Sequence, residues 1–96
     1  MVNYKLSPKT TEDFVELYEY RIHKFGLLQA QEYANQLHEI LEYLLQRPEL
    51  WRKVFHIKSN LYNFRYQSHI IFFVDGNDKL YIVRILEGHR DFTRHL

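Results

Sequence analysis

The spacing of the apolar residues changes once along this chain, and that change constrains the fold more than any other feature. Through residues 8–46 apolar side chains recur at helical spacing, whereas through residues 61–86 they alternate with a period of two. A short alternating stretch at residues 2–6 precedes the first helical pattern. The expected order is therefore one strand, two helices and three strands.

Local signals set the ends of the two helices. Ser7 and Pro8 fit the N-cap and the first helical position, and Gly26 supplies a stop. The second helix should end before Pro48, because the residue preceding a proline avoids the helical conformation. Since only a few residues around Gly26 separate the helical patterns, we expect an antiparallel helical hairpin. Turns are expected at residues 67–68 and 75–78.

Alternation gives each of the three later strands one set of side chains without formal charge. These sets are Tyr62, Phe64 and Tyr66; Ile70, Phe72 and Val74; and Tyr81, Val83 and Ile85. Because burying an unpaired arginine is costly, we predict that these sets lie under the helices. Arg65, His69 and Arg84 would then share the opposite, open face. The predicted fold is a single α+β domain over residues 1–96, with a helical hairpin packed on one face of a mainly antiparallel sheet.

Composition limits the classes of protein. The 96 residues include no cysteine, which excludes disulfide frameworks and thiolate metal sites and fits a reducing compartment. The first residues contain no apolar run typical of a signal peptide, and no segment reaches the length that spans a bilayer. We therefore expect a soluble, cytoplasmic protein without a membrane partner.

The net charge of +1 conceals an asymmetry between the two halves of the chain. Residues 1–46 hold four Lys/Arg against seven acids, 4 − 7 = −3, and residues 47–96 hold nine against five, 9 − 5 = +4. The second half therefore suits an acidic or polyanionic partner. The whole chain is less basic than a typical nucleic-acid-binding domain, and we expect no direct sequence-specific binding of nucleic acid.

The stretch "RILEGHRDF", residues 84–92, places charged and titratable groups just past the last expected strand. A half-apolar, half-basic surface of this kind is typical of an interaction site. The residues expected to form this interaction site are Arg65, Arg84, His89, Arg90, Asp91 and Phe92. The alternative for each is structural, and Arg84 in particular can pair with Asp91 or Glu87.

Four segments in this order resemble the RelE/ParE superfamily of small bacterial toxins, and most closely its ParE, or plasmid-stabilisation, branch. They are "YKLSPKTTEDFVELYEY", "FGLLQAQEYANQLHEILEYLLQRPEL", "SHIIFFV" and "IVRIL". They are similar to the family's first strand and helix, its Gly-x-x-Gln-Ala-x-x-Tyr helix, its His-Val-Ile-Phe-Tyr strand and its last strand. The resemblance covers nearly the whole chain.

The chain departs from the family pattern after the last strand. The family commonly continues His-Gly-Arg-Arg-Asp, whereas this chain has Glu87, Gly88, His89, Arg90 and Asp91. The family's histidine is thus replaced by Glu87, and its first arginine by His89. A charge reversal at a binding site opposes binding, so a degenerate homologue that only binds an antitoxin stays open as an interpretation.

The resemblance implies the toxin of a type II toxin–antitoxin system. By this analogy the protein inhibits DNA gyrase and replication without being an enzyme, and a co-expressed ParD-like or other antitoxin neutralises it. The antitoxin is expected to cover apolar surface on the helical hairpin and a sheet edge and to pair acids with the basic C-terminal region.

The alternative implied by the same superfamily is a ribosome-dependent mRNA endoribonuclease of the RelE type. Cutting RNA at a 2′-hydroxyl needs a base, an acid and cations that stabilise the phosphorane-like charge. The candidates for these roles are Lys53, Lys58, Arg65, His69, Arg90 and His95. RelE-type enzymes commonly carry a late tyrosine or histidine, but Phe92 in that region cannot transfer a proton, which favours the gyrase hypothesis.

Other kinds of site find little support. His38 and Glu42 lie one helical turn apart, but no third ligand is near them in the sequence, so we expect no metal. The chain has only three glycines and no glycine-rich phosphate loop, and no cofactor is expected.

Overall fold

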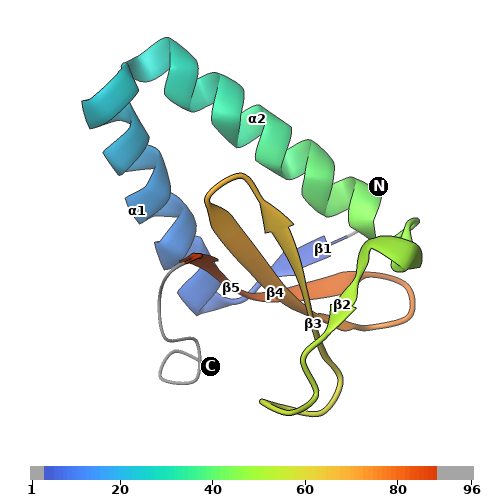
Figure 1. The fold of residues 1–96 in the computed structure, drawn as a ribbon. Helices are drawn as coiled ribbons and strands as arrows, with labels where there is room; N and C mark the ends of the chain where they lie inside the picture. The colour runs from blue at the N-terminus through green and yellow to red at the C-terminus, as the bar shows by residue number, and fades with distance from the viewer. Residues whose placement is uncertain (1–3, 89–96) are drawn as a thin grey trace.

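The computed structural model describes residues 4–88, and its elements follow the expected order (Figure 1). The strands are β1 (Tyr4–Leu6), β2 (Arg52–Lys53), β3 (Leu61–Tyr66), β4 (His69–Asp75) and β5 (Leu80–Glu87). The helices are α1 (Pro8–Phe25), α2 (Leu27–Leu44) and the 3-10 helix η1 (Pro48–Leu50). The sequence pattern missed only the short elements η1 and β2.

One five-stranded sheet runs in the order β1-β5-β4-β3-β2. β1 is parallel to β5, and every other neighbouring pair is antiparallel. The two helices diverge from their shared turn and lie over one face of the sheet (Figure 1). The expected α+β fold with a helical hairpin on one face of a mainly antiparallel sheet is confirmed.

The expected helix boundaries are present and have local causes. Ser7 caps α1 by accepting the Thr10 N–H on its side-chain oxygen at 3.0 Å. Gly26 lies between α1 and α2 and caps both helices. Its φ of 93° is a backbone conformation that favours glycine. α2 ends at Leu44, before Pro48, as expected.

The two strand turns also fall where the sequence predicts them. A two-residue turn joins Tyr66 to His69, with Gln67 at φ 53°. In the β4–β5 turn a Cβ at Gly76 would lie 2.3 Å from the Tyr81 ring, so only glycine fits there without displacing that ring.

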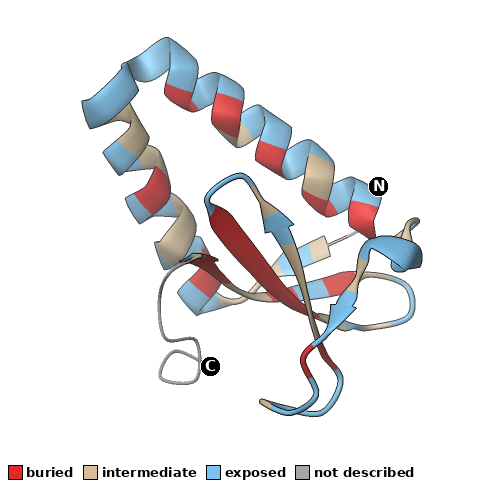
Figure 2. Ribbon diagram, viewed as in Figure 1, coloured by how far each residue is buried: buried red, intermediate tan, exposed pale blue. Residues whose placement is uncertain are grey.

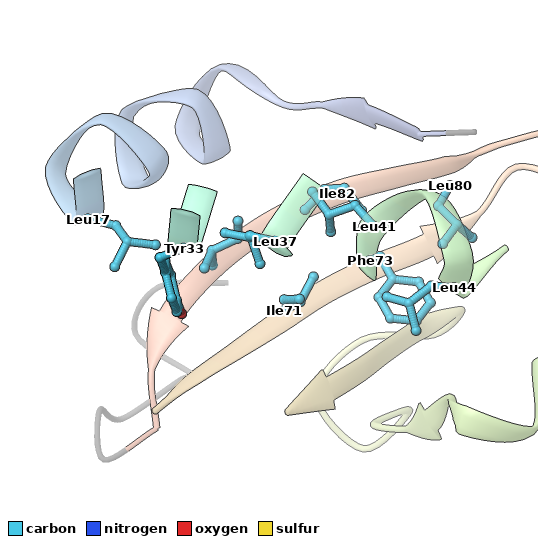
Figure 3. Packing of buried hydrophobic residues seen from close by; sticks show 10 residues of the cluster. Leu17, Tyr33, Leu37, Leu41, Leu44, Ile71, Phe73, Leu80 and Ile82 are labelled. Carbon is cyan, nitrogen blue, oxygen red and sulfur yellow. The ribbon is translucent and has the colours of Figure 1, made fainter. Parts of the chain in front are cut away.

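The main hydrophobic core lies between the helices and the sheet (Figures 2 and 3). Its buried residues are Leu17, Tyr33, Leu37, Leu41, Leu44, Ile71, Phe73, Leu80, Ile82 and Ile85. Trp51 packs against this core, and its indole N–H donates to the Leu44 carbonyl at 2.7 Å. The end of α2 is thereby tied to the chain that leads into β2.

A second hydrophobic cluster lies on the face of the sheet opposite the helices. We call this face the open face. Its buried residues are Val54, Leu61, Ile70, Phe72 and Leu86, with Ile57, Val74 and Val83 packed against it. The connection between β2 and β3 supplies Val54 and Ile57, so the open face carries an apolar layer of its own.

The prediction of which side chains lie under the helices is right for β3 and wrong for β4. Tyr62, Phe64 and Tyr66 pack against the main core as predicted. In β4, however, Ile71 and Phe73 lie under the helices, and the predicted set belongs to the open face. The physical reason is that both β4 sets are apolar enough to be buried, so charge alone does not decide between them.

β5 follows neither predicted set, because a bulge interrupts its pairing with β4. Phe73 pairs with Ile82 and Phe72 with Arg84, which leaves Val83 as the extra residue. Ile85 therefore lies in the main core, as predicted, whereas Val83 packs on the open face, and its inclusion under the helices was wrong. Tyr81, from the same predicted set, is exposed.

Candidate functional site at the end of strand β5

The predicted recognition cluster begins at the end of β5, where α1 replaces β1 as the neighbour of this strand. β1 pairs with β5 only as far as Ile82. At that point the Thr10 hydroxyl donates to the Ile82 carbonyl at 2.8 Å, and just beyond it the Ser7 hydroxyl donates to the Val83 carbonyl at 2.9 Å. Polar side chains at the start of α1 thus satisfy a strand edge that no other strand covers within residues 4–88.

Asp13 of α1 lies further along the same edge of β5 and binds Arg84. Nε and Nη2 of Arg84 each donate to a different oxygen of the Asp13 carboxylate at 2.8 Å. The Ile85 N–H donates to the same carboxylate at 3.1 Å. The two side chains are only 10% and 14% exposed, so the pair is largely desolvated. Hydrogen bonding to Asp13 raises the pKa of Arg84, and the guanidinium stays charged.

His69 lies on the helix-covered face rather than on the open face. Its Nδ1 is 3.2 Å from the Tyr33 hydroxyl of α2 and 3.3 Å from the Ser68 hydroxyl. Burial lowers the pKa of His69; the opposite charge of Glu87 counteracts this effect and the positive charge of Arg21 adds to it. The prediction that His69, Arg65 and Arg84 share one open face is therefore wrong.

Arg21 of α1 completes this polar group. Its guanidinium carbon lies 3.7 Å from the centre of the Tyr33 ring, which is a close cation–π contact. Its Nε is buried, and no hydrogen-bond partner for it lies within the described residues. Burial raises the pKa of Tyr33, the positive charge of Arg21 lowers it, and Tyr66 raises it again.

A cleft of about 370 Å³ lies between α1, the start of β4 and the end of β5. Its lining includes Glu16, Arg21, His69 and Glu87. Sequence reasoning missed this cleft because its members come from α1 and from two strands. One available signal was that Asp13 and Arg21 each lie four residues from Leu17, so helical spacing places both charges beside the apolar stripe of α1.

Two of the arginines predicted for the interaction site, Arg65 and Arg84, are described by the structure. Of these two, only Arg65 is exposed, and it lies on the open face. Its guanidinium lies against Gly88: a Cβ built on Gly88 would be 2.5 Å from Nη1 and 3.1 Å from Cζ. The Gly88 N–H donates to the Ser68 carbonyl at 2.9 Å. The β3–β4 hairpin therefore holds the residue from which the last segment of the chain continues.

Several predicted site residues are not placed by this geometry. His89, Arg90, Asp91, Phe92 and His95 lie outside the described residues.

The nuclease candidates that are described do not converge. Lys53 and Lys58 are exposed on β2 and in the connection to β3. Arg65 and His69 stand on opposite faces of the sheet. No three residues of the His, Asp or Glu type form a metal cluster within residues 4–88, and His38 is bonded to the Tyr4 hydroxyl instead.

A groove between the two helices was also missed by the sequence reading. It has a volume of about 550 Å³, and Phe14 in its wall also packs against the main core. Its lining residues are Phe14, Val15, Tyr18, Glu19, Gln31, Ala34, Asn35 and His38. Val15 is 50% exposed, so the groove offers apolar surface to a partner.

No helix within residues 4–88 has the length and apolar character needed to cross a membrane.

Sequence comparisons find similar proteins over nearly the whole chain. A family model described as "ParE toxin of type II toxin-antitoxin system, parDE" matches residues 4–92. The chain is 24% identical over 96 residues to Toxin ParE1 of Caulobacter vibrioides, covering 100% of this chain and 99% of that protein. It is 26% identical over 94 residues to Toxin ParE1 of Mycobacterium tuberculosis, covering 97% and 96%.

A solved structure titled "Chromosomal ParDE TA system from P. aeruginosa" has the same fold. The TM-score is 0.73 at 16% sequence identity, over 91% of this chain and 96% of that chain.

Proposed function

The chain belongs to the ParE toxin family of type II toxin–antitoxin systems, and on that basis we propose that it inhibits DNA gyrase and so arrests replication. A cognate antitoxin releases the cell from this arrest. The observation that carries the proposal is the family match over residues 4–92, which includes the recognition cluster predicted after β5.

The separation of Arg65 from His69 supports a non-enzymatic inhibitor. A ribonuclease needs its acid, its base and its cations within reach of one phosphate. Arg65 is exposed on the open face, whereas His69 is buried under the helices beside Tyr33. These two candidates therefore do not share a substrate-binding surface.

The groove between α1 and α2 is the antitoxin surface in this proposal. Its apolar members Phe14, Val15 and Ala34 suit the apolar stripe of an amphipathic helix. The same antitoxin is expected to place acidic side chains against the basic C-terminal segment, which includes Arg90. Arg90 remains the leading candidate for contact with the target.

The experiment that tests this function is pulse labelling of cells just after the protein is induced. Incorporation of labelled thymidine should fall before incorporation of labelled methionine, and a DNA-damage response should follow. Purified protein should also raise the amount of DNA that purified gyrase leaves cleaved. The Arg90→Ala variant should lose both effects while its thermal midpoint stays near that of the wild type.

A matched control is Lys9→Ala, which removes an exposed cation at the start of α1. This variant should keep both effects. An early collapse of methionine incorporation with intact replication would overturn the gyrase proposal in favour of an mRNA endonuclease. Growth without arrest, combined with normal antitoxin binding, would indicate a degenerate homologue.

A further inference from the structure

Positive charge is concentrated in one part of the described chain, around β2 and β3. Residues 50–74 contain four Lys/Arg and no Asp or Glu. Three of these cations, Arg52, Lys53 and Lys58, lie on β2 and in the connection to β3, and all three are exposed. Figure 2 shows β2 in the colour of exposed residues. β2 is the last strand of the sheet, so its outer edge is not covered by another strand of the described part.

The register places Arg52 and Lys53 on opposite faces of the edge. Lys53 pairs with Tyr62, whose side chain packs on the helix-covered side. Arg52 pairs with Asn63 and therefore points to the open face, which also bears Arg65. A polyanion running along this edge thus meets positive charge on either side.

An exposed aromatic residue lies among these cations. Phe55 is 44% exposed, and the Nζ of Lys53 is 5.8 Å from the centre of its ring. One side of Phe55 contacts Tyr62 edge to face at 5.4 Å between ring centres. Tyr62 in turn contacts Trp51 at 5.1 Å, so the exposed ring is braced by aromatic side chains that reach the core. Phe55 is therefore a fixed platform rather than a loose surface residue.

Protection of an edge strand from aggregation explains a lysine on β2, but it does not explain this combination. Negative design against edge pairing favours charge, and an exposed phenylalanine beside the same edge works against it. A supported aromatic ring beside exposed cations is instead the arrangement with which proteins bind nucleic-acid strands without reading their sequence. The ring stacks on a base, and the cations neutralise neighbouring phosphates.

We propose that the β2 edge, made of Arg52, Lys53, Phe55 and Lys58, binds the backbone and one unstacked base of DNA independently of sequence. This inference rests on the proposed function, because gyrase holds DNA and an inhibitor bound beside it meets that DNA. The surface would anchor the toxin to the DNA that gyrase has cleaved, while the segment after β5 contacts the enzyme.

The test measures binding of the full-length toxin, freed of antitoxin, to a fluorescein-labelled oligonucleotide by fluorescence anisotropy. The oligonucleotide is used as a single strand and as a duplex, between about 50 and 200 mM salt. Neutralisation of three phosphates predicts a slope of about −2 in log K against log salt for the single strand. The single strand is expected to bind more tightly, because its bases are free to stack on Phe55.

Two variants separate charge from stacking. The triple variant R52Q/K53Q/K58Q should abolish most of the salt-dependent binding. Phe55→Ser should weaken single-strand binding by about tenfold and leave the salt slope unchanged. The matched control is K5Q/K9Q/K24Q, which removes the same charge from exposed positions on β1 and α1. Circular dichroism melts confirm that each variant is folded.

Equal losses in the two triple variants would overturn the proposal, since binding would then depend only on net charge. Unchanged DNA binding in R52Q/K53Q/K58Q would also overturn the proposal. If this variant lost affinity for the antitoxin but not for DNA, the edge would instead be a binding site for an acidic peptide. Gyrase inhibition by a toxin that binds no DNA refutes this inference alone. DNA binding by a toxin that leaves gyrase untouched refutes the proposed function alone.

Discussion

The guanidinium of Arg65 lies against Gly88, so that a methyl group on Gly88 would come within 2.5 Å of Nη1. The Gly88 N–H is at the same time bonded to the Ser68 carbonyl in the β3–β4 turn. An arginine predicted to bind a partner therefore also supports the start of the segment that carries Arg90. These two roles make different predictions for paired substitutions.

We expect Gly88→Ala and Arg65→Ala to reduce growth arrest by similar factors. The alanine at position 88 displaces the guanidinium, whereas the substitution at position 65 removes it. If Arg65 acts through Gly88, the double variant should lose no more activity than either single variant, since neighbouring sites that act as a unit are not additive. The measurement is the rate of loss of colony-forming cells at matched expression.

Multiplied losses in the double variant would contradict this role and show that Arg65 contacts the partner directly. We expect the thermal midpoint of Gly88→Ala to stay near that of the wild type, because Arg65 is exposed and its flexible guanidinium should move away from the new methyl group. A lower midpoint would contradict this expectation. Arg65→Lys serves as the control that keeps the charge but removes the planar group.

The Asp13–Arg84 pair is predicted to hold the end of β5 rather than to bind a target. Asp13→Ala removes the acceptor of two Arg84 donors and of the Ile85 N–H. Removing one partner of a largely buried ion pair costs about 3–5 kcal/mol of unfolding free energy. Urea denaturation should show a loss of this order.

Asp13→Asn keeps one carbonyl oxygen as an acceptor and should lose less than Asp13→Ala. A loss below about 1 kcal/mol in Asp13→Ala would be typical of an exposed pair and would contradict a structural role. Since Asp13 does not line the groove between the helices and both variants leave the segment after Gly88 unchanged in sequence, antitoxin binding below the melting temperature should persist.

The β4–β5 turn offers a prediction about packing alone. Gly76→Ala places a methyl group 2.3 Å from the Tyr81 ring and 2.7 Å from the Lys79 carbonyl oxygen, and we expect a loss of roughly 1–3 kcal/mol. Asn77→Gly in the same turn is the control, because Asn77 has φ of 74° and glycine adopts that conformation freely. Thermal melts that rank the two variants in the opposite order would contradict this account.

Local sequence signals predicted most of the helices and strands, because the ends and the periodicity of these elements depend on residues close together in the sequence. Ser7, Gly26 and the alternating strands each have a cause within a few residues. The assignment of faces needed tertiary information: both sets of β4 side chains are apolar, and the Val83 bulge reverses the alternation in β5. A rule that places charge outside therefore misplaced His69, which finds Tyr33 as a partner under the helices.

The candidate site was predictable only in part, for a similar reason. The charges after β5 stand together in the sequence and were identified. Asp13 is separated from Arg84 by 71 positions, so their pairing could not be read from spacing. The groove between the helices likewise requires the crossing geometry of α1 and α2, which apolar periodicity does not give.

The buried His69 makes the stability of the protein depend on pH. Because its pKa in the folded protein is lowered from the reference value of 6.5, the unfolded chain takes up a proton first as the pH falls. Proton binding to the unfolded state favours unfolding, so this residue lowers stability as the pH drops from 6.5 toward its folded pKa. Well above pH 6.5 the residue is neutral in both states and contributes no slope.

Urea denaturation from about pH 7 to about pH 5 should therefore show a steeper loss of unfolding free energy in the wild type than in His69→Gln. His69→Asn should show the same shallower slope, even if its shorter side chain packs differently and changes the absolute stability. The groups that face His69 are Tyr33, Ser68, Glu87 and Arg21, and both variants retain them. Parallel curves for the wild type and both variants would show that His69 takes up its proton as readily in the folded protein as in the unfolded chain.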